Sequence, residues 1–330
     1  MENPFPNCVV AVLVVAYYCI YISGAVASLE SDEFSLLQFK KLITSDPENI
    51  LAKNWSTATS TCRWTGVVCN GKQRVAAVHL SGLGLSGIIS PSLGNLTFLT
   101  SLDISDNHFT GQIPGGLSKL RRLKDLNFGS NNLVGEVPFW LGSLPQLRKL
   151  FLNNNNFTGI IPPSLCNISM MEQLDMGYNM LRGNIPQEIG NLSNLESLHL
   201  ESNMITGSLP DTIFNVSSLL TLNLKGNGLS GRLPSDMCNN HATHIQELYL
   251  YANEFNGQIP SSICKCKEIK ILALSSNQFN GSIPTEIGRL TMLHTLNLSV
   301  NNFRGTVLPS FCYFIILSTF QFISLSINTE

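Results

Sequence analysis

Charge is scarce in this chain of 330 residues. Asp, Glu, Lys and Arg make up 13% of it, about half the share usual in soluble proteins. The net charge is −2, and no basic tract or basic-aromatic face occurs, so we expect no nucleic-acid partner. Catalytic patterns are missing too. The histidines that could serve a catalytic site stand singly, and there is no nucleophile-elbow or metalloprotease motif, so we expect neither enzyme activity nor a cofactor.

Long hydrophobic runs occur near the two ends. The run from Cys8 to Ile22, followed by Ala25-Val26-Ala27, predicts a signal peptide over residues 1–27 and a secreted or cell-surface protein. An uncleaved signal anchor is the alternative, because the first seven residues carry no Lys or Arg. Residues 311–327 are apolar but shorter than the roughly 20 residues of a spanning helix. We interpret 309–330 as a non-repeat apolar tail, with a membrane anchor as the alternative.

Most of the remaining sequence is one repeat. Its template is LxxLxLxxNxLxGxIPxxLGxLxx, with every unit 24 residues long except the seventh, which has 26. The units begin at Val75, Leu99, Leu123, Leu147, Met171, Leu195, Leu219, Ile245, Ile269 and Leu293. Ten such units over residues 75–308 predict a single solenoid that grows by stacking.

Each position of the repeat has a predicted role. The period-two segment at positions 1–8 predicts a strand with positions 4 and 6 buried and positions 3, 5, 7 and 8 facing solvent. Ten parallel strands would form a concave sheet about 45–50 Å long. Asn at position 9 predicts a ladder of amides that satisfies the turn backbone. The Gly-x-Ile-Pro element that follows predicts a short second strand that ends at Pro.

Residues 28–74 do not fit the repeat and predict an N-terminal cap. Ser31 and Asp32 can begin a helix. Its apolar positions recur with helical spacing and are Leu36, Phe39 and Ile43. Cys62 and Cys69 lie close together outside the repeats of an exported chain, which predicts a disulfide between them. The helix and the stapled loop would cover the open face of the first coil.

Three further cysteines lie around the seventh and eighth units. Cys238 and Cys264 both occupy position 20 of neighbouring units, which favours a bridge between coils, with buried thiols as the alternative. Cys238, His241 and His244, with Cys264 and Cys266, are residue types that bind zinc. Their spacing matches no zinc family, so we expect no metal.

Glycosylation motifs also support export. Eight Asn-x-Ser/Thr sequons are present, at Asn54, Asn95, Asn156, Asn167, Asn191, Asn215, Asn280 and Asn297. Four of them occupy position 21 of their units and would form one line of glycans, leaving other faces free for partners. The alternative is that Asn is simply a turn residue at this position.

Large aromatic and charged residues gather at the solvent-facing positions of units four to eight. They are Phe151, Asp175, Tyr178, His199, Glu201, Lys225, Tyr249 and Tyr251. Exposed aromatic residues beside charges are typical anchors of interfaces, which predicts a ligand-binding surface. The alternative is that Tyr and Phe merely favour strands.

The motifs resemble a known family. The repeat contains LxGxIPxxLGxL, and the cap has the form W…CxWxGVxC, carried by Trp55, Cys62, Trp64, Gly66, Val67 and Cys69. Over about residues 28 to 307 the chain is similar to plant-type leucine-rich-repeat ectodomains of receptor-like kinases, especially the immune-receptor group of the flagellin and bacterial-blight receptors.

The resemblance implies an α/β-type repeat solenoid, a horseshoe or superhelix with a parallel concave sheet and a helical, disulfide-stapled cap. It also implies recognition of a peptide or protein elicitor on the concave face, recruitment of a co-receptor ectodomain, and no kinase in this chain. The alternative is a secreted defence protein similar to polygalacturonase inhibitors. Those proteins carry four cysteines in each cap, whereas this chain has two in its first cap, which favours the receptor.

Overall fold

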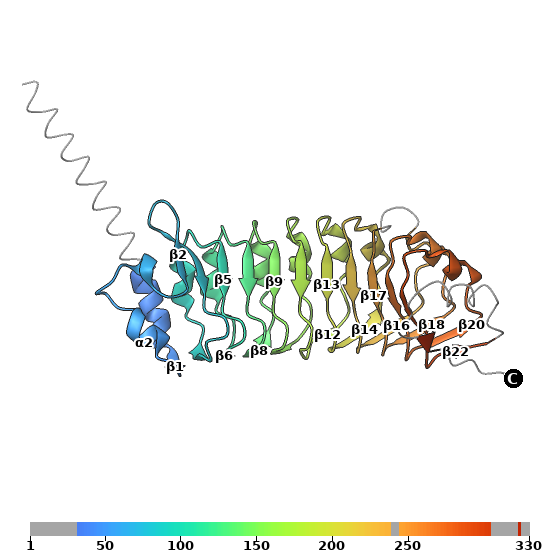
Figure 1. The fold of residues 1–330 in the computed structure, drawn as a ribbon, viewed down its shortest axis with the longest axis horizontal. Helices are drawn as coiled ribbons and strands as arrows, with labels where there is room; N and C mark the ends of the chain where they lie inside the picture. Colours follow the sequence, from blue (N-terminus) through green and yellow to red (C-terminus); the bar gives the residue numbers. More distant parts are fainter. Residues whose placement is uncertain (1–31, 239–243, 305–322, 325–330) are drawn as a thin grey trace, which may run out of the picture.

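The computed structural model describes residues 32–238, 244–304 and 323–324. These residues form an elongated stack of coils with the N-terminal cap at one end (Figure 1). The predicted signal peptide and most of the predicted apolar tail lie outside the described residues. Within the tail, only Ile323–Ser324 is described, as strand β23 beside β21 (Thr295–Asn297).

A long sheet of twelve strands runs the length of the stack. Ten of its strands come one from each repeat and pair in parallel, as position 1–8 periodicity predicts. In order they are β3 (Val75–His79), β5 (Ser101–Asp103), β7 (Asp125–Asn127), β9 (Lys149–Phe151), β11 (Gln173–Asp175), β13 (Ser197–His199), β15 (Thr221–Asn223), β17 (Glu247–Tyr249), β19 (Ile271–Ala273) and β21. Strand β2 (Val67–Cys69) adds an antiparallel edge at the cap.

The residues that lead into the Gly of each Gly-x-Ile-Pro element form two shorter sheets along a second side. The first contains β1 (Ile43–Ser45), β4 (Ser86–Ile88), β6 (His108–Gly111), β8 (Asn132–Glu136) and β10 (Asn156–Thr158). The second contains β12 (Arg182–Gly183), β14 (Met204–Ser208), β16 (Gly228–Gly231), β18 (Glu254–Gly257), β20 (Gln278–Gly281) and β22 (Asn302–Phe303). Most of these strands end at or next to that Gly, two to four residues before the Pro, so the second strand lies earlier in the unit than predicted and the Pro is not what ends it.

The third side consists of short 3-10 helices rather than α-helices. They are η2 (Pro91–Asn95), η3 (Gly115–Lys119), η4 (Phe139–Ser143), η5 (Pro163–Asn167), η6 (Gln187–Asn191), η7 (Asp211–Asn215), η8 (Ser261–Lys265) and η9 (Thr285–Arg289). Most follow a Pro, whose fixed φ suits the start of a helix.

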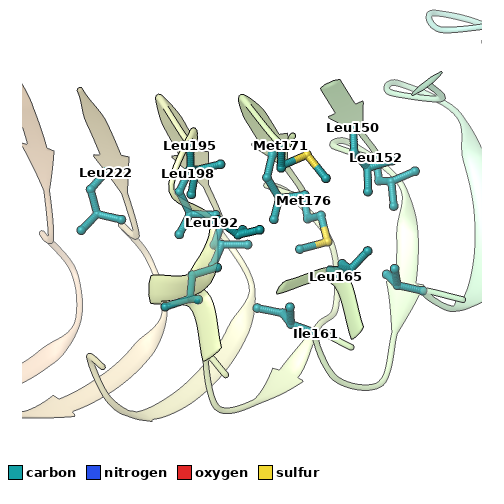
Figure 2. Packing of buried hydrophobic residues seen from close by; sticks show 14 of the residues in the cluster. Leu150, Leu152, Ile161, Leu165, Met171, Met176, Leu192, Leu195, Leu198 and Leu222 are labelled. Carbon is teal, nitrogen blue, oxygen red and sulfur yellow. The ribbon is translucent and has the colours of Figure 1, made fainter. Parts of the chain in front are cut away.

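One continuous apolar core fills the stack. The Leu and Met side chains at positions 1, 4 and 6 of neighbouring coils point inward and contact one another (Figure 2). Leu150, Leu152, Met171 and Met176 are at most 1% exposed. Because each coil buries its side chains only against its neighbours, every added coil extends the same core.

The predicted asparagine ladder is present. Asn107 donates from Nδ2 to the carbonyls of Leu80, Ile104 and Ser105, and its Oδ1 accepts from Leu85 N–H at 2.9 Å. Leu80 and Leu85 belong to the preceding coil, so each amide closes the turn of its own coil and of the one before it. Leu83 is the one exception at position 9, and it lies in the first coil, where no earlier repeat needs closing.

The cap is built differently from its prediction in one respect. Residues 32–41 are helical, but Ile43 lies in β1, which pairs antiparallel with β4. The pairing requires a glycine at position 87, because a Cβ on Gly87 would lie 2.2 Å from the carbonyl oxygen of Leu42. The helix therefore ends before Ile43, and near its start Asp32 accepts hydrogen bonds from the Arg74 side chain and the Val75 N–H.

Aromatic stacking joins the cap to the first coils. Phe39 stacks on Phe109 at 5.8 Å between ring centroids, and Trp55 stacks on Trp64 at 5.3 Å. The helix α2 (Ile50–Asn54) and the 3-10 helix η1 (Thr61–Arg63) complete the cap. The disulfide between Cys62 and Cys69 is confirmed.

The second disulfide differs from the prediction. Cys238 is bonded to Cys266, and Cys264 is a free, half-buried thiol. A residue at position 20 points toward the next coil: a Cβ on Gly94 or Gly142 would touch the carbonyl of position 18 in the following coil. Cys264 therefore points away from Cys238. The partner of Cys238 is Cys266, which stands at the inward-facing position 22.

Candidate ligand-binding surface

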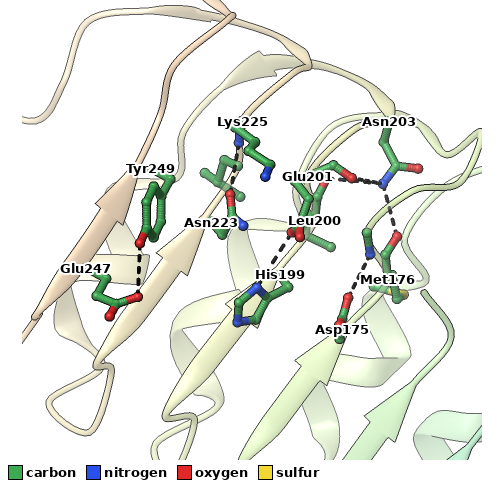
Figure 3. A network of polar contacts seen from close by, with 12 residues as sticks. Asp175, Met176, His199, Leu200, Glu201, Asn203, Asn223, Lys225, Glu247 and Tyr249 are labelled. Atoms are coloured by element: carbon green, nitrogen blue, oxygen red, sulfur yellow. Dashed lines mark hydrogen bonds and ion pairs between the residues drawn. The ribbon is translucent and has the colours of Figure 1, made fainter. Parts of the chain in front are cut away.

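The predicted ligand-binding residues come from neighbouring strands of the long sheet. Strands β9, β11, β13, β15 and β17 are consecutive, and their position 5 residues lie in register across the sheet. This row is Phe151, Asp175, His199, Asn223 and Tyr249. The side chains of positions 7 and 8 follow directly after these strands, so all eight predicted residues lie on one continuous surface. We call this the coil 4–8 surface, and Figure 3 shows its part from Asp175 to Tyr249.

A glycine interrupts the row of position 7 side chains. Gly177 leaves a space, and the carboxylate of Glu201 from the next coil leans over it. A Cβ on Gly177 would lie 2.9 Å from Glu201 Cδ. Glu201 is consequently only 8% exposed. The prediction that Glu201 faces solvent is therefore wrong, and the reason is the missing side chain at Gly177.

His199 is the nearest cationic group to this buried carboxylate. Its Nδ1 lies 3.6 Å from Glu201 Oε2, which is too long for a hydrogen bond, and Oε2 accepts none. The contact with Glu201 raises the pKa of His199. Burial opposes this rise, and the negative charges of Glu201, Asp175 and Glu247 add to it. Burial raises the pKa of Glu201, but His199, the backbone amide of Glu201 and Lys225 outweigh it and lower that pKa overall.

Asp175 lies beside the same space. Its Oδ1 accepts the Gly177 N–H at 3.0 Å. Burial raises the pKa of Asp175, and the negative charge of Glu201 adds to the rise. The Gly177 N–H and His199 act in the opposite direction and lower this pKa. The two carboxylates thus disfavour each other's charge while His199 partly compensates both.

Lys225 lies between two aromatic rings. Its Nζ is 5.8 Å from the ring centroid of Tyr178 and 5.8 Å from that of Tyr251. These are cation–π distances. Tyr178 is 45% exposed, and its backbone is left-handed with φ 55°. The Lys225 side chain therefore reaches back over the coil that carries Glu201.

Tyr249 closes the surface at its eighth-coil end. Its hydroxyl donates to Glu247 Oε2 at 3.3 Å. Burial, together with the charge of Glu247, raises the pKa of Tyr249. Tyr249 and Tyr251 are both half-buried, so part of each residue is exposed to solvent.

Two participants were not singled out from the sequence. Gly177 escaped notice because a glycine carries no group to bind anything, although its lack of a side chain was visible in the position 7 row. Glu247 stands at position 3, which also faces solvent, and reading that row together with positions 5 and 7 would have found it.

The sequons differ in how accessible their side chains are. The four asparagines at position 21 end the 3-10 helices η2, η5, η6 and η7, and all four are exposed. Asn156 on β10 and Asn280 on β20 are exposed as well. Asn54 is half-buried and its Oδ1 accepts from the Thr65 N–H. Asn297 lies in β21, where its Oδ1 accepts from the Ser299 N–H and hydroxyl. Glycosylation remains a prediction at every sequon.

The part of the chain that the structure describes contains no group of three or more His, Cys, Asp and Glu side chains placed to hold a metal ion. In the same residues, no helix has both the length and the apolar character needed to span a bilayer.

Comparison with known proteins agrees with the repeat and the cap. Residues 29–70 match the leucine rich repeat N-terminal domain, and leucine rich repeat models match residues 97–156 and seven segments between 146 and 314. The LRR receptor-like serine/threonine-protein kinase EFR of Arabidopsis thaliana is 36% identical over 97 residues, which are 29% of this chain and 9% of that protein. This chain belongs to the plant leucine-rich-repeat receptor ectodomain family. Its match spans less than a tenth of that relative's length.

Solved structures of the family extend the similarity over most of this leucine-rich-repeat chain. The ectodomain of GASSHO1/SCHENGEN3 from Arabidopsis thaliana, in complex with CASPARIAN STRIP INTEGRITY FACTOR 2, has a TM-score of 0.79 and 35% identity, covering 84% of this chain and 34% of that one. The Arabidopsis receptor kinase HAESA, in complex with the peptide hormone IDA and the co-receptor SERK1, has a TM-score of 0.69 and 29% identity, covering 86% and 52%. Both are receptor ectodomains bound to ligands.

Proposed function

We propose that this chain is an extracellular recognition module that binds a peptide or protein elicitor on the coil 4–8 surface. The observation that carries the proposal is the continuity of this surface. Five adjacent strands in register present three partly exposed tyrosines, one phenylalanine and a set of charges. Large aromatic side chains held by a rigid sheet lose little entropy on binding, which makes them suitable anchors.

The proposal includes a co-receptor and excludes catalysis from residues 28–308. The related receptor kinase HAESA is known in complex with the peptide hormone IDA and the co-receptor SERK1. The kinase portion of the relatives lies outside the match to this chain. Recognition would therefore be the contribution of these residues, with the predicted signal peptide and sequons placing them outside the cell.

The test compares two variants against a panel of synthetic peptides from bacterial and plant extracellular proteins. Tyr249→Ala with Tyr251→Ala should weaken binding at least about tenfold, since each is a candidate anchor, and should leave the unfolding temperature nearly unchanged. Ile160→Ala is the matched control, because Ile160 is 54% exposed on the second side of the stack.

Two results would contradict the proposal. One is equal binding by wild type and the double tyrosine variant. The other is an unfolding temperature that falls together with binding, which would make the tyrosines part of the core. A polygalacturonase inhibition assay in parallel addresses the alternative of a secreted inhibitor, which predicts inhibition of the enzyme without peptide binding.

A further inference from the structure

The carboxylates around Gly177 have the chemistry of a cation site. Glu201 lies over the glycine, where a side chain at position 177 would be, and Asp175 lies beside it on β11. Phe151 is next to Asp175 in register and half-buried. A guanidinium or ammonium group is stabilised both by carboxylates and by the faces of aromatic rings.

The carboxylate of Glu201 is short of donors. Glu201 is more than nine-tenths buried, and its Oε2 accepts no hydrogen bond, although His199 Nδ1 lies 3.6 Å away. In the described part of the chain, Asp175 Oδ1 accepts one N–H and Oδ2 accepts none. A buried carboxylate oxygen without a donor is costly, so an incoming N–H donor would relieve an existing deficit.

The surrounding charges also favour a cation. Asp175, Glu201 and Glu247 supply three negative charges, against the ammonium of Lys225 and the imidazole of His199. Lys225 has no carboxylate within ion-pair distance among the described residues and instead lies on Tyr178 and Tyr251. One ammonium group is thus already held against aromatic rings beside Glu201. An anionic ligand group at Gly177 would face two carboxylates.

We propose that the Asp175 and Glu201 carboxylates beside Gly177 bind a basic group of the ligand, either an arginine or lysine side chain or a free amino terminus. The inference rests on the proposed function and names the chemistry of the ligand. His199 would compete with that group for the same carboxylates, because it carries the charge that the ligand would bring.

The experiment selects ligands from a phage-displayed library of random peptides. The library is panned at neutral pH on the full chain, and enriched sequences are synthesised. We expect enriched peptides to carry Arg or Lys. Glu201→Gln and Asp175→Asn should each weaken their binding about tenfold or more, the loss expected for one charge-assisted hydrogen bond. Both variants preserve side-chain shape, and their unfolding temperatures are measured first.

The matched control is Glu136→Gln, which removes the same charge from an exposed position on β8 of the second side. It should change affinity less than twofold. Peptides are also tested with an acetylated amino terminus and with each basic residue replaced by glutamine. Loss on acetylation identifies the amino terminus as the bound group, and loss on replacement identifies the side chain; either result supports the proposal.

The outcomes distinguish failure of the proposed function from failure of the proposed cation site. If no peptide is enriched, or if enriched peptides bind the double tyrosine variant as well as wild type, the proposed function itself fails. If peptides require the tyrosines but lack basic residues, or bind both Glu201→Gln and Asp175→Asn as tightly as wild type, then recognition stands and the cation site is overturned.

Discussion

Glu201 lies over Gly177, and a single added carbon at Gly177 would come within 2.9 Å of the Glu201 carboxyl carbon. The position of the buried carboxylate is thus set by a residue one coil away that has no side chain. The backbone of Gly177 is not left-handed, so alanine fits its conformation. This relationship can be tested without disturbing the sheet.

Gly177→Ala should push the Glu201 carboxylate away from His199. Without that contact the pKa of His199 should fall toward its ordinary value of about 6.5, as measured by NMR titration of the imidazole. Folding stability should change by less than about 1 kcal/mol, since the glycine-to-alanine gain in the unfolded chain offsets the displaced side chain. Gly288→Ala is the control, because a Cβ there meets no atom of the described residues within 4 Å. An unchanged His199 pKa in Gly177→Ala would contradict the packing described.

The pH dependence of stability should report the same contact. Because the pKa of His199 is raised in the folded state, the stabilisation from His199 is complete below about pH 6.5, its ordinary pKa. This stabilisation is lost as the pH rises through the raised pKa of the folded state. The pKa of Glu201 is lowered, so its carboxylate stabilises the folded state above about pH 4.5, its ordinary pKa, and this stabilisation is lost as the pH falls.

Urea unfolding between about pH 6 and 8 should therefore show a stability that declines with pH and a smaller decline in His199→Gln. His108→Gln is the control, since His108 is exposed on β6. A slope that is the same in His199→Gln as in wild type would show that another group titrates.

The asparagine ladder should dominate the polar contribution to stability. Asn155 accepts from the Leu133 N–H and donates to the carbonyls of Phe128, Leu152 and Asn153. Asn155→Ala leaves buried backbone groups without partners and should cost about 2–4 kcal/mol, measured by chemical unfolding. Asn132→Ala, at an exposed position on β8, should cost less than about 0.5 kcal/mol. Equal effects would mean that the ladder bonds contribute little.

The disulfide assignment gives a chemical prediction. Trypsin cuts after Lys265 and separates Cys264 from Cys266, so non-reducing peptide mapping should find Cys238 joined to the Cys266 peptide and Cys264 alkylated. Cys266→Ser should lower stability by about 3–4 kcal/mol, the value for a loop of this length, because the bridge spans 28 residues. Cys264→Ser should leave it nearly unchanged. A Cys238–Cys264 peptide would refute the assignment.

Features that depend on one repeat unit could be predicted from the sequence, because the 24-residue period shows them ten times. The ten strands, the Asn107-type ladder and the inward positions belong to this class. Features that depend on how two coils or distant segments meet could not. Ile43 is in a strand because Gly87, 44 positions later, admits the backbone of Leu42. Cys266 rather than Cys264 meets Cys238 because position 20 points forward, and Glu201 is buried because Gly177 is bare.

The direction of the ladder has an evolutionary consequence. Each asparagine serves its own coil and the coil before it, and none reaches forward. Gain or loss of a unit inside the stack therefore leaves every remaining coil followed by an asparagine, and only loss of the last unit leaves the coil before it without that partner. A gene encoding such a protein can duplicate or delete internal units without breaking the ladder, which lets receptor length diverge among relatives while the surface chemistry of each retained coil is inherited unaltered.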